Sequence, residues 1–157
     1  MEGLVFRQAT SMDFPSLARI ISTTEAWTCY GIDYDQVLDL LGNMEDLIYV
    51  AEKENQTLGF ITVRLNGVGN IGAYIRMVAV AEAFRSQGIG EKLVAFVENL
   101  AFRHIPNLFL ICSVDNTRAQ HFYERVGFEN VGILPNLVIS GHDEILCRKT
   151  AKTLREC

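Results

Sequence analysis

The sequence predicts an α/β fold in which a mixed sheet carries helices on its faces. Several segments have apolar residues every three or four positions and indicate amphipathic helices, while short apolar or β-branched runs indicate strands. One of these runs, at 108–114, is continuously apolar, which is typical of a central strand buried on both faces. The predicted order β-α-α-β-β-β-α-β-α-β-β fits a sheet layered with helices.

The first predicted elements are a strand over 4–10 and two helices. Ser11 follows the strand and is expected to cap the first helix, because its hydroxyl can accept a free backbone N–H. The second helix is expected to start at Asp33, which forms a capping-box pattern with Gln36. Gly42 is expected to end it.

The middle of the chain predicts a β-hairpin, a strand and a helix. Segments 47–53 and 57–65 flank a turn-like tripeptide, and a glycine-rich connection then leads to a strand over 73–80. The helix follows a glycine-containing bend, since the apolar residues after the bend share one helical face. These residues are Leu93, Val94, Val97, Leu100 and Ala101.

After the apolar strand, segment 116–128 predicts a helix with Asn116 near its cap and Gly127 at its C-terminal end. Two last strands are expected at 136–140 and 144–150, with a Gly-His-Asp turn between them.

Length and composition predict one globular domain over 1–150, followed by a short tail at 151–157. The hydrophobic share of 49% and the charged share of 21% are ordinary for such a domain. The net charge of -5 argues against a nucleic-acid partner, which needs clustered Lys and Arg, and is compatible with an amine partner.

The four cysteines show no Cys-x-x-Cys pair and no ligand-like spacing with the three histidines, so we expect neither a disulfide framework nor a metal. The N-terminus lacks the apolar run of a signal peptide, and no stretch approaches the roughly 18 apolar residues of a membrane span. These features predict a cytoplasmic protein with no membrane partner.

The bend at 85–90, Arg-Ser-Gln-Gly-Ile-Gly, joins a strand to a helix. The first N–H groups of a helix have no acceptor within it, and the helix dipole makes this end favourable for a phosphate. Gly88 and Gly90 have no Cβ and allow close approach, and Arg85 adds a guanidinium. The bend matches neither the dinucleotide fingerprint nor the nucleotide P-loop, and a plain turn is the alternative.

The chain resembles the GNAT N-acetyltransferases in two motifs. Segment 85–90 is similar to the acetyl-coenzyme A loop of that family, Arg/Gln-x-x-Gly-x-Gly/Ala after a strand. A second motif is similar to Asn-x-x-Ala-x-x-Phe-Tyr-x-x-x-Gly-Phe and consists of Asn116, Ala119, Phe122, Tyr123, Gly127 and Phe128. The resemblance implies a mixed, mostly antiparallel sheet of about seven strands flanked by about four helices.

The resemblance also implies acetyl-coenzyme A as the acyl donor. Amides from Ser86 to Gly90 would bind its pyrophosphate, the strand before the bend would pair with its pantetheine arm, and Asn116 would bind the arm near the thiol. The expected contacts are Val78, Ala79, Val80, Arg85, Ser86, Gln87, Gly88, Ile89, Gly90, Asn116 and Tyr123.

Amide formation from a thioester needs an acceptor for the proton of the ammonium and a donor for the departing thiolate. Tyr123 is the expected acid, because a phenol stays protonated at pH 7; packing of the helix is its alternative role. Some family members carry a glutamate base two residues ahead of the Val78 position, where this chain has Arg76. Arginine does not release its proton, so another side chain or a water chain is expected to act.

Segment 23–35 borders the acceptor site in this family and combines carboxylates with aromatic rings, which suits an ammonium group. The candidates are Glu25, Trp27, Tyr30, Asp33 and Tyr34. Capping by Asp33 and core packing of Trp27 are alternatives. A small cationic amine is favoured slightly over a peptide N-terminus, and a homodimer stays open. Two other functions also stay open: a non-catalytic module that binds acyl-coenzyme A, and a transferase for another acyl group.

Overall fold

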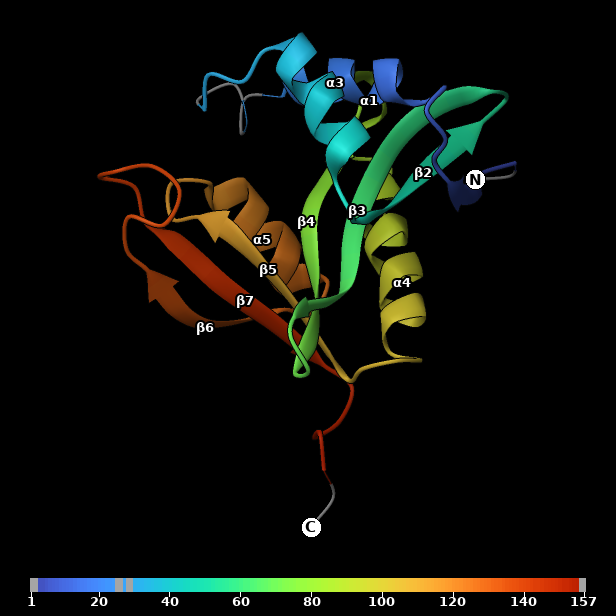
Figure 1. The fold of residues 1–157 in the computed structure, drawn as a ribbon. Coiled ribbons are helices and arrows are strands. Elements are labelled where there is room, and N and C mark those ends of the chain that lie inside the picture. Colours follow the sequence, from blue (N-terminus) through green and yellow to red (C-terminus); the bar gives the residue numbers. More distant parts are fainter. Residues whose placement is uncertain (1–2, 25–26, 28–29, 156–157) are drawn as a thin grey trace. The chain divides into compact units, whose positions relative to one another are not determined.

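The computed structural model describes residues 3–24, 27 and 30–155. A sheet of seven strands runs in the order β1-β2-β3-β4-β5-β7-β6. The ribbon in Figure 1 labels each of these strands except β1. The strands are β1 (Val5–Gln8), β2 (Leu47–Lys53), β3 (Gln56–Val68), β4 (Gly72–Val80), β5 (Asn107–Ser113), β6 (Glu129–Leu134) and β7 (Glu144–Thr150). The helices are α1 (Phe14–Ser22), α3 (Tyr34–Asn43), η1 (Glu82–Phe84), α4 (Ile89–Ala101) and α5 (Thr117–Arg125).

This architecture confirms the predicted fold class and order of elements. The pairs β1–β2, β2–β3, β5–β7 and β6–β7 are antiparallel, and β4 pairs in parallel with β5. The chain divides into two compact units, Met1–Val63 with Met77–Val97, and Arg64–Arg76 with Glu98–Cys157. The predicted single domain over 1–150 stays a prediction.

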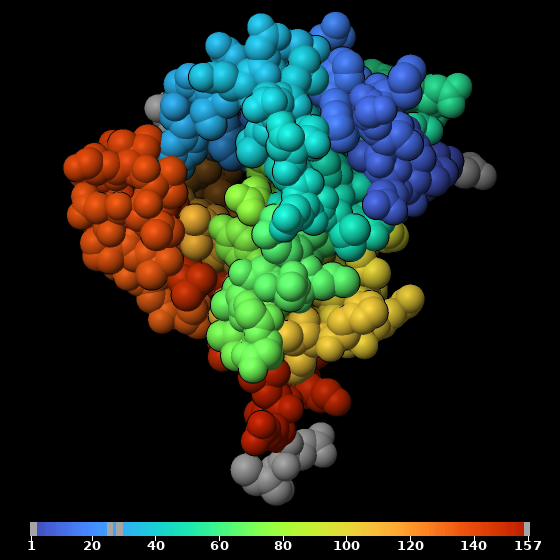
Figure 2. Space-filling model, viewed as in Figure 1, coloured from blue at the N-terminus to red at the C-terminus, as the bar shows by residue number. Residues whose placement is uncertain are grey.

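In the first unit, helices pack on both faces of the strands. The buried faces of α1 and α3 contact one face of β2, β3 and the end of β4, and Figure 2 shows these helices in blue and cyan at the surface. On the other face, Phe96 of α4 stacks on Phe6 of β1 at 5.4 Å between ring centroids. Tyr49 of β2 meets the same ring edge-on at 5.0 Å.

The start of α1 differs from the prediction, because Asp13 and not Ser11 occupies the N-cap. The Asp13 carboxylate accepts two hydrogen bonds from Arg7, at 2.9 and 2.7 Å, and one from the Thr10 N–H at 2.7 Å. Arg7 is also paired with Glu52 on β2. These bonds lower the pKa of Asp13 to about 2. They also hold the Asp13 side chain at the start of the helix.

The capping box of α3 is confirmed. The Asp33 carboxylate accepts the Gln36 N–H at 2.9 Å, and the Gln36 side chain accepts the Asp33 N–H at 2.9 Å. Gly42 lies inside the helix, so the prediction that it ends the helix was wrong. The Asn43 side chain donates to the Asp39 carbonyl at 2.9 Å and stabilises one more residue of the last turn.

The β2–β3 hairpin is confirmed, with positive φ at Glu54 (51°) and Asn55 (62°) in its turn. β3 continues three residues past the predicted end, to Val68. Gly67 permits this extension, since a Cβ there would lie only 2.4 Å from the Cβ of Tyr74 on the neighbouring strand.

In the second unit, α5 lies beside β5 and β7. The side chain of Lys149 on β7 bonds to Glu98 in the last turn of α4 at 2.6 Å and to the Val126 carbonyl after α5 at 2.8 Å. Phe128, which follows α5, is only 3% exposed. One lysine therefore joins the ends of two helices to the sheet.

The strand predicted at 136–140 was wrong. β6 lies earlier, at Glu129–Leu134, and the following segment forms turns that belong to the orange-red surface in Figure 2. Asn136 has a φ of 53°, and its side chain accepts the Gly141 N–H at 2.6 Å. The Asp143 carboxylate accepts the Asn136 N–H at 3.1 Å, so side-chain bonds close this segment as a loop.

Candidate functional site

In the first unit, β4 leads through η1 into the loop before α4. Val78 and Val80 are half-buried, while Ala79 on the opposite face is 8% exposed. A Cβ at Gly59 of β3 would lie 2.6 Å from the Ala79 carbonyl oxygen, so glycine lets the two strands approach closely. This close contact holds the end of β4 in place ahead of the loop.

The loop itself turns its backbone twice through left-handed conformations, at Ser86 (φ 62°) and at Gly88 (φ 75°). Alternation of this kind can direct successive N–H groups toward one concave surface, where an anion binds. Among the described residues, no hydrogen bond uses the N–H groups of Ser86, Gln87, Gly88, Ile89 and Gly90. The 13-residue helix α4 begins directly at this point and adds its dipole.

The side chain of Arg85 is bonded within the first unit. Its Nε donates to the Val80 carbonyl at 3.1 Å, and its Nη2 donates to the Thr24 hydroxyl at 3.2 Å. The Arg85 side chain therefore has two protein partners besides any bond to a phosphate. The partner Thr24 was missed from the sequence, because a single hydroxyl 61 residues away leaves no local signal.

Of the expected acceptor residues, Glu25 lies outside the described residues. Trp27 and Tyr34 are half-buried and pack against the core of the first unit, with the Trp27 ring 6.4 Å from Phe60. Tyr30 is half-buried, and its N–H donates to the Trp27 carbonyl at 3.0 Å. Asp33 uses its carboxylate in the capping box. Trp27 and Tyr34 therefore have a packing role and Asp33 has a capping role.

In the second unit, Asn116 is the N-cap of α5, as predicted. Its Oδ1 accepts the Ala119 N–H at 3.0 Å, which leaves the amide Nδ2 of the same side chain as a donor. Gln120 fixes the chain just before the helix through bonds from its Nε2 to the carbonyls of Ser113 (3.1 Å) and Val114 (2.7 Å). Asn116 can therefore cap the helix and donate a hydrogen bond at the same time.

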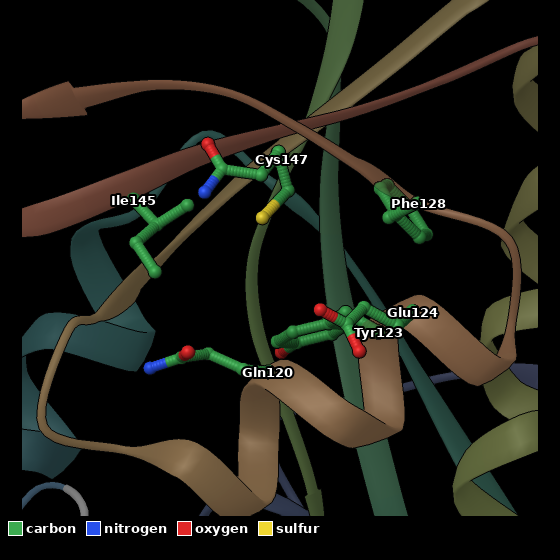
Figure 3. A pocket seen from close by; sticks show the side chains of 7 residues that line it. Gln120, Tyr123, Glu124, Phe128, Ile145 and Cys147 are labelled. Carbon is green, nitrogen blue, oxygen red and sulfur yellow. The ribbon is translucent and has the colours of Figure 1, made fainter.

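Tyr123 lies on α5 and faces the sheet. Its ring meets Phe122 and Phe128 edge-on, at 5.2 and 5.9 Å. Figure 3 shows Gln120 and Tyr123 on one side of a small cavity and Ile145 and Cys147 on the other. The cavity measures about 30 Å³, room for about one water molecule. Its lining residues are Gln120, Tyr123, Glu124, Phe128, Asn130, Ile145 and Cys147.

Burial raises the pKa of the Tyr123 phenol above its ordinary value, and the nearby Cys112, Cys147 and Tyr74 raise it further. In the part of the chain that the structure describes, the Tyr123 hydroxyl has no hydrogen-bond partner. The hydroxyl is therefore not needed to anchor the helix, although the ring packs it. A protonated phenol at neutral pH is the state that a proton donor requires.

Cys112 and Cys147 are free thiols, both buried. The hydrogen bond with Cys147 raises the pKa of Cys112, and burial and the charge of Glu144 act in the same direction. Cys112 is therefore an uncharged, inaccessible thiol and a poor nucleophile, as its place in an apolar strand suggests.

No group of three or more His, Cys, Asp or Glu side chains within 3–24, 27 and 30–155 could hold a metal ion. None of the helices described has both the length and the apolar composition to cross a membrane.

Comparisons with known proteins identify the family of the chain. The model of the Acetyltransferase (GNAT) family matches residues 14–128. An uncharacterized N-acetyltransferase of Methanocaldococcus jannaschii is 35% identical over 104 residues, which cover 64% of either chain. N-alpha-acetyltransferase 30 of Schizosaccharomyces pombe is 37% identical over 71 residues, 45% of this chain and 47% of the relative. The chain thus spans 64% of the length of the first relative and 47% of the second.

Solved structures share the fold. Ard1 from Thermoplasma volcanium has a TM-score of 0.79 and 24% identity, covering 96% of this chain and 99% of that one. A protein described as a streptothricin acetyltransferase of Bacillus anthracis, solved with acetyl coenzyme A, has a TM-score of 0.62 and 29% identity, over 70% and 65% of the two chains. The family match includes both the loop before α4 and the whole of α5. The chain therefore belongs to the GNAT acetyltransferase family.

Proposed function

We propose that this protein transfers an acetyl group from acetyl-coenzyme A to a primary amine, by direct attack of the amine in a ternary complex. The observation that carries the proposal is the loop before α4, where the N–H groups of 86–90 have no acceptor among the described residues. A helix N-terminus with such free donors is a site suited to phosphate. Relatives named as N-acetyltransferases support the reaction class.

The residues present fit coenzyme A. The two left-handed positions, Ser86 and Gly88, shape the loop. Apart from its own neighbours in the chain, no described residue would lie within 4 Å of a Cβ at Gly88. The space beside Gly88 is thus free for a ligand to approach the backbone. We assign the pyrophosphate to the amides of 86–90, the pantetheine arm to Val78, Ala79 and Val80, and its thiol end to the Nδ2 of Asn116. When bound, acetyl-coenzyme A supplies the activated acetyl thioester.

Two proton movements fall to the protein. Tyr123 is the proposed donor to the departing thiolate, because a phenol is protonated at neutral pH and burial favours that uncharged form. The ammonium form of the acceptor must also lose a proton before it attacks. Arg76 is exposed on β4, and an arginine side chain is not a base in this reaction, so we assign this step to another side chain or to a water chain.

As the acceptor we propose a peptide α-amine. The acidic segment 23–35 slightly favoured a small cationic molecule as the acceptor. In the structure, however, the Asp33 carboxylate caps α3. Proteins named as N-alpha-acetyltransferases recur among the relatives, in Schizosaccharomyces pombe and in Sulfurisphaera tokodaii. A free α-amine near pKa 8 is also easier to deprotonate than an alkyl amine near 10.

A calorimetric titration with acetyl-coenzyme A tests the loop. Gly88→Glu should abolish binding, because it places a carboxylate beside the phosphates, while Ser86→Gly keeps the left-handed conformation and should bind normally. Transfer to peptides with different N-terminal residues, and to a polyamine, then identifies the acceptor class. Binding without transfer to any amine would support the non-catalytic module instead. No binding by a folded wild type would end the proposal.

A further inference from the structure

His142 and Asp115 form a side-chain pair next to Asn116 in the second unit. His142 lies in the loop between β6 and β7, and its Nδ1 is 3.3 Å from the carboxylate oxygen Oδ2 of Asp115. Asp115 directly precedes Asn116, the N-cap of α5, so the Cα atoms of these two residues are about 3.8 Å apart. The imidazole is therefore held one residue away from the side chain that we assign to the thiol end of coenzyme A.

The loop that carries His142 is fixed to the end of β5 by hydrogen bonds. The Val114 N–H, just after β5, donates to the Asp143 carbonyl at 3.0 Å. The Asp143 carboxylate accepts the Asn136 N–H at 3.1 Å, and the Asn136 side chain accepts the Gly141 N–H at 2.6 Å. These bonds involve both chain neighbours of His142, so the position of its backbone is well defined.

The pair with Asp115 decides which nitrogen of a neutral imidazole carries the proton. A neutral imidazole has one donor and one acceptor nitrogen, and a carboxylate can only accept. The bond to Asp115 therefore places the proton of the neutral ring on Nδ1 and the lone pair on Nε2. Within residues 3–24, 27 and 30–155, no group forms a hydrogen bond with Nε2. The lone pair of Nε2 is thus available to accept a proton.

The exposure of the pair also bears on its role. The side chains of His142 and Asp115 are 55% and 77% exposed, and an ion pair in solvent adds little to stability. An exposed Nε2 can be reached by an acceptor molecule and can release a proton to water. The adjacent carboxylic acid, Glu144, is only 3% exposed and is a poorer candidate for such an exchange.

We propose that His142 is the base that accepts the ammonium proton of the acceptor, and that Asp115 is a positioning residue that orients the imidazole. This inference rests on the proposed function, which leaves the step without a named residue because Arg76 is not a base. Histidine is the side chain whose neutral form is a base near neutral pH.

The protons of the transfer balance with these residues. One ammonium proton passes to Nε2 of His142 and then to water, and the lone pair of the amine forms the C–N bond. The C–S bond breaks with its electron pair on sulfur, and Tyr123 gives this sulfur a proton. The second proton that the nitrogen loses returns Tyr123 to its phenol form through water. One proton thus ends on sulfur and one in solvent.

Rescue by added imidazole tests the base. His142→Ala should lower kcat by about a hundredfold, measured with the peptide that the wild type acetylates fastest, while Kd for acetyl-coenzyme A changes by about twofold or less. Free imidazole should restore part of the rate of His142→Ala, because it can occupy the space of the missing ring, but should not restore Tyr123→Phe. The matched control is His121→Ala, at an exposed histidine of α5, which should keep the wild-type kcat.

Nitrogen NMR tests the orientation of the ring without any turnover. At about pH 9, where imidazole rings are neutral, the ¹⁵N shifts of His142 should show the proton on Nδ1. Asp115→Ala removes the acceptor and should move the proton toward Nε2. The same variant should lower kcat by about tenfold with an unchanged Kd for acetyl-coenzyme A, as expected for a residue that acts through the imidazole.

Wild-type kcat in His142→Ala would overturn the inference, and so would a loss of kcat that imidazole leaves unchanged. A proton on Nε2 in the wild type would also contradict it. All three outcomes leave the proposed function standing. A wild type that binds acetyl-coenzyme A but acetylates no amine would instead remove the proposed function and this inference together.

Discussion

The surroundings of Tyr123 set its chemistry. The phenol is packed between aromatic rings and faces two buried thiols, and burial raises its pKa above the ordinary value near 10. Such a group stays protonated over the whole range in which amines are acetylated. It therefore carries the proton that a donor needs and cannot serve as the base for the amine, while the raised pKa makes it a weaker acid than a free phenol.

We expect Tyr123→Phe to lower kcat by about a hundredfold or more, the usual contribution of a positioned acid. The ring contacts with Phe122 and Phe128 do not involve the hydroxyl, so the fold and the Kd for acetyl-coenzyme A should be nearly unchanged. Steady-state kinetics together with a calorimetric titration separate the two effects. Wild-type turnover in this variant would show that the tyrosine only packs the helix.

Asp13 provides a prediction about pH. Its pKa of about 2 lies below the ordinary 3.8, so its contribution to stability is present above pH 4 and is lost as the pH falls toward 2. The shift corresponds to about 2 kcal/mol at neutral pH. Asp13→Asn should lose about this amount in urea unfolding at pH 7, with much less difference from the wild type near pH 2.

The control for Asp13 is Glu54→Gln, at an acidic side chain that is 86% exposed. A surface substitution of this kind should change the free energy of unfolding by about 0.5 kcal/mol or less at either pH. An equal loss for Asp13→Asn at pH 7 and pH 2 would contradict an ionic origin of its effect.

Single residues were predictable from the sequence where their partners are local. The capping box of Asp33 and Gln36 spans three positions and was predicted correctly. The cap of α1 was not, because the choice of Asp13 over Ser11 depends on Arg7 and Glu52, which come from two different strands. Local patterns carry no information about such pairs.

At the scale of elements, two N-caps with different expected functions can be compared. Asn116→Ala and Asp33→Ala each remove a side-chain acceptor from the start of a helix and should each cost about 1 kcal/mol of stability. Only Asn116→Ala should also weaken acetyl-coenzyme A binding, by about tenfold, since it removes the Nδ2 donor as well. Unfolding and binding are measured on both variants.

Equal affinity of the two cap variants for acetyl-coenzyme A would contradict the assignment of Asn116 to the ligand. Capping α5 would then be the only role of the Asn116 side chain.

Elements were predictable where hydrophobic pattern and end signals agree, as in α4 and β5. The segment 136–140 has the composition of a strand, yet hydrogen bonds that the side chains of Asn136 and Asp143 accept from backbone N–H groups close it into a loop. The true strand, β6, pairs with β7 while it exposes Val131 and Ile133, so its pattern is poor as a sequence signal. The pairing partner, and not the composition, decides which segment is the strand.

At the scale of the whole molecule, the two spaced motifs predicted the family and with it the sheet. They could not predict the contacts that join distant segments, such as Lys149 with Glu98 or Arg85 with Thr24. Each of these contacts depends on the complete fold, because its two residues are brought together only by several intervening elements.

A ligand that binds only the folded chain stabilises the whole molecule. At 100 times its Kd, acetyl-coenzyme A should add about 2.7 kcal/mol, which for a chain of this length raises Tm by about 5–10 °C. Differential scanning calorimetry measures this shift. Pantetheine, which lacks the phosphates, should raise Tm by about 1 °C or less at the same concentration if the loop amides provide most of the affinity. Equal shifts for the two ligands would mean that the arm, and not the phosphate loop before α4, dominates binding.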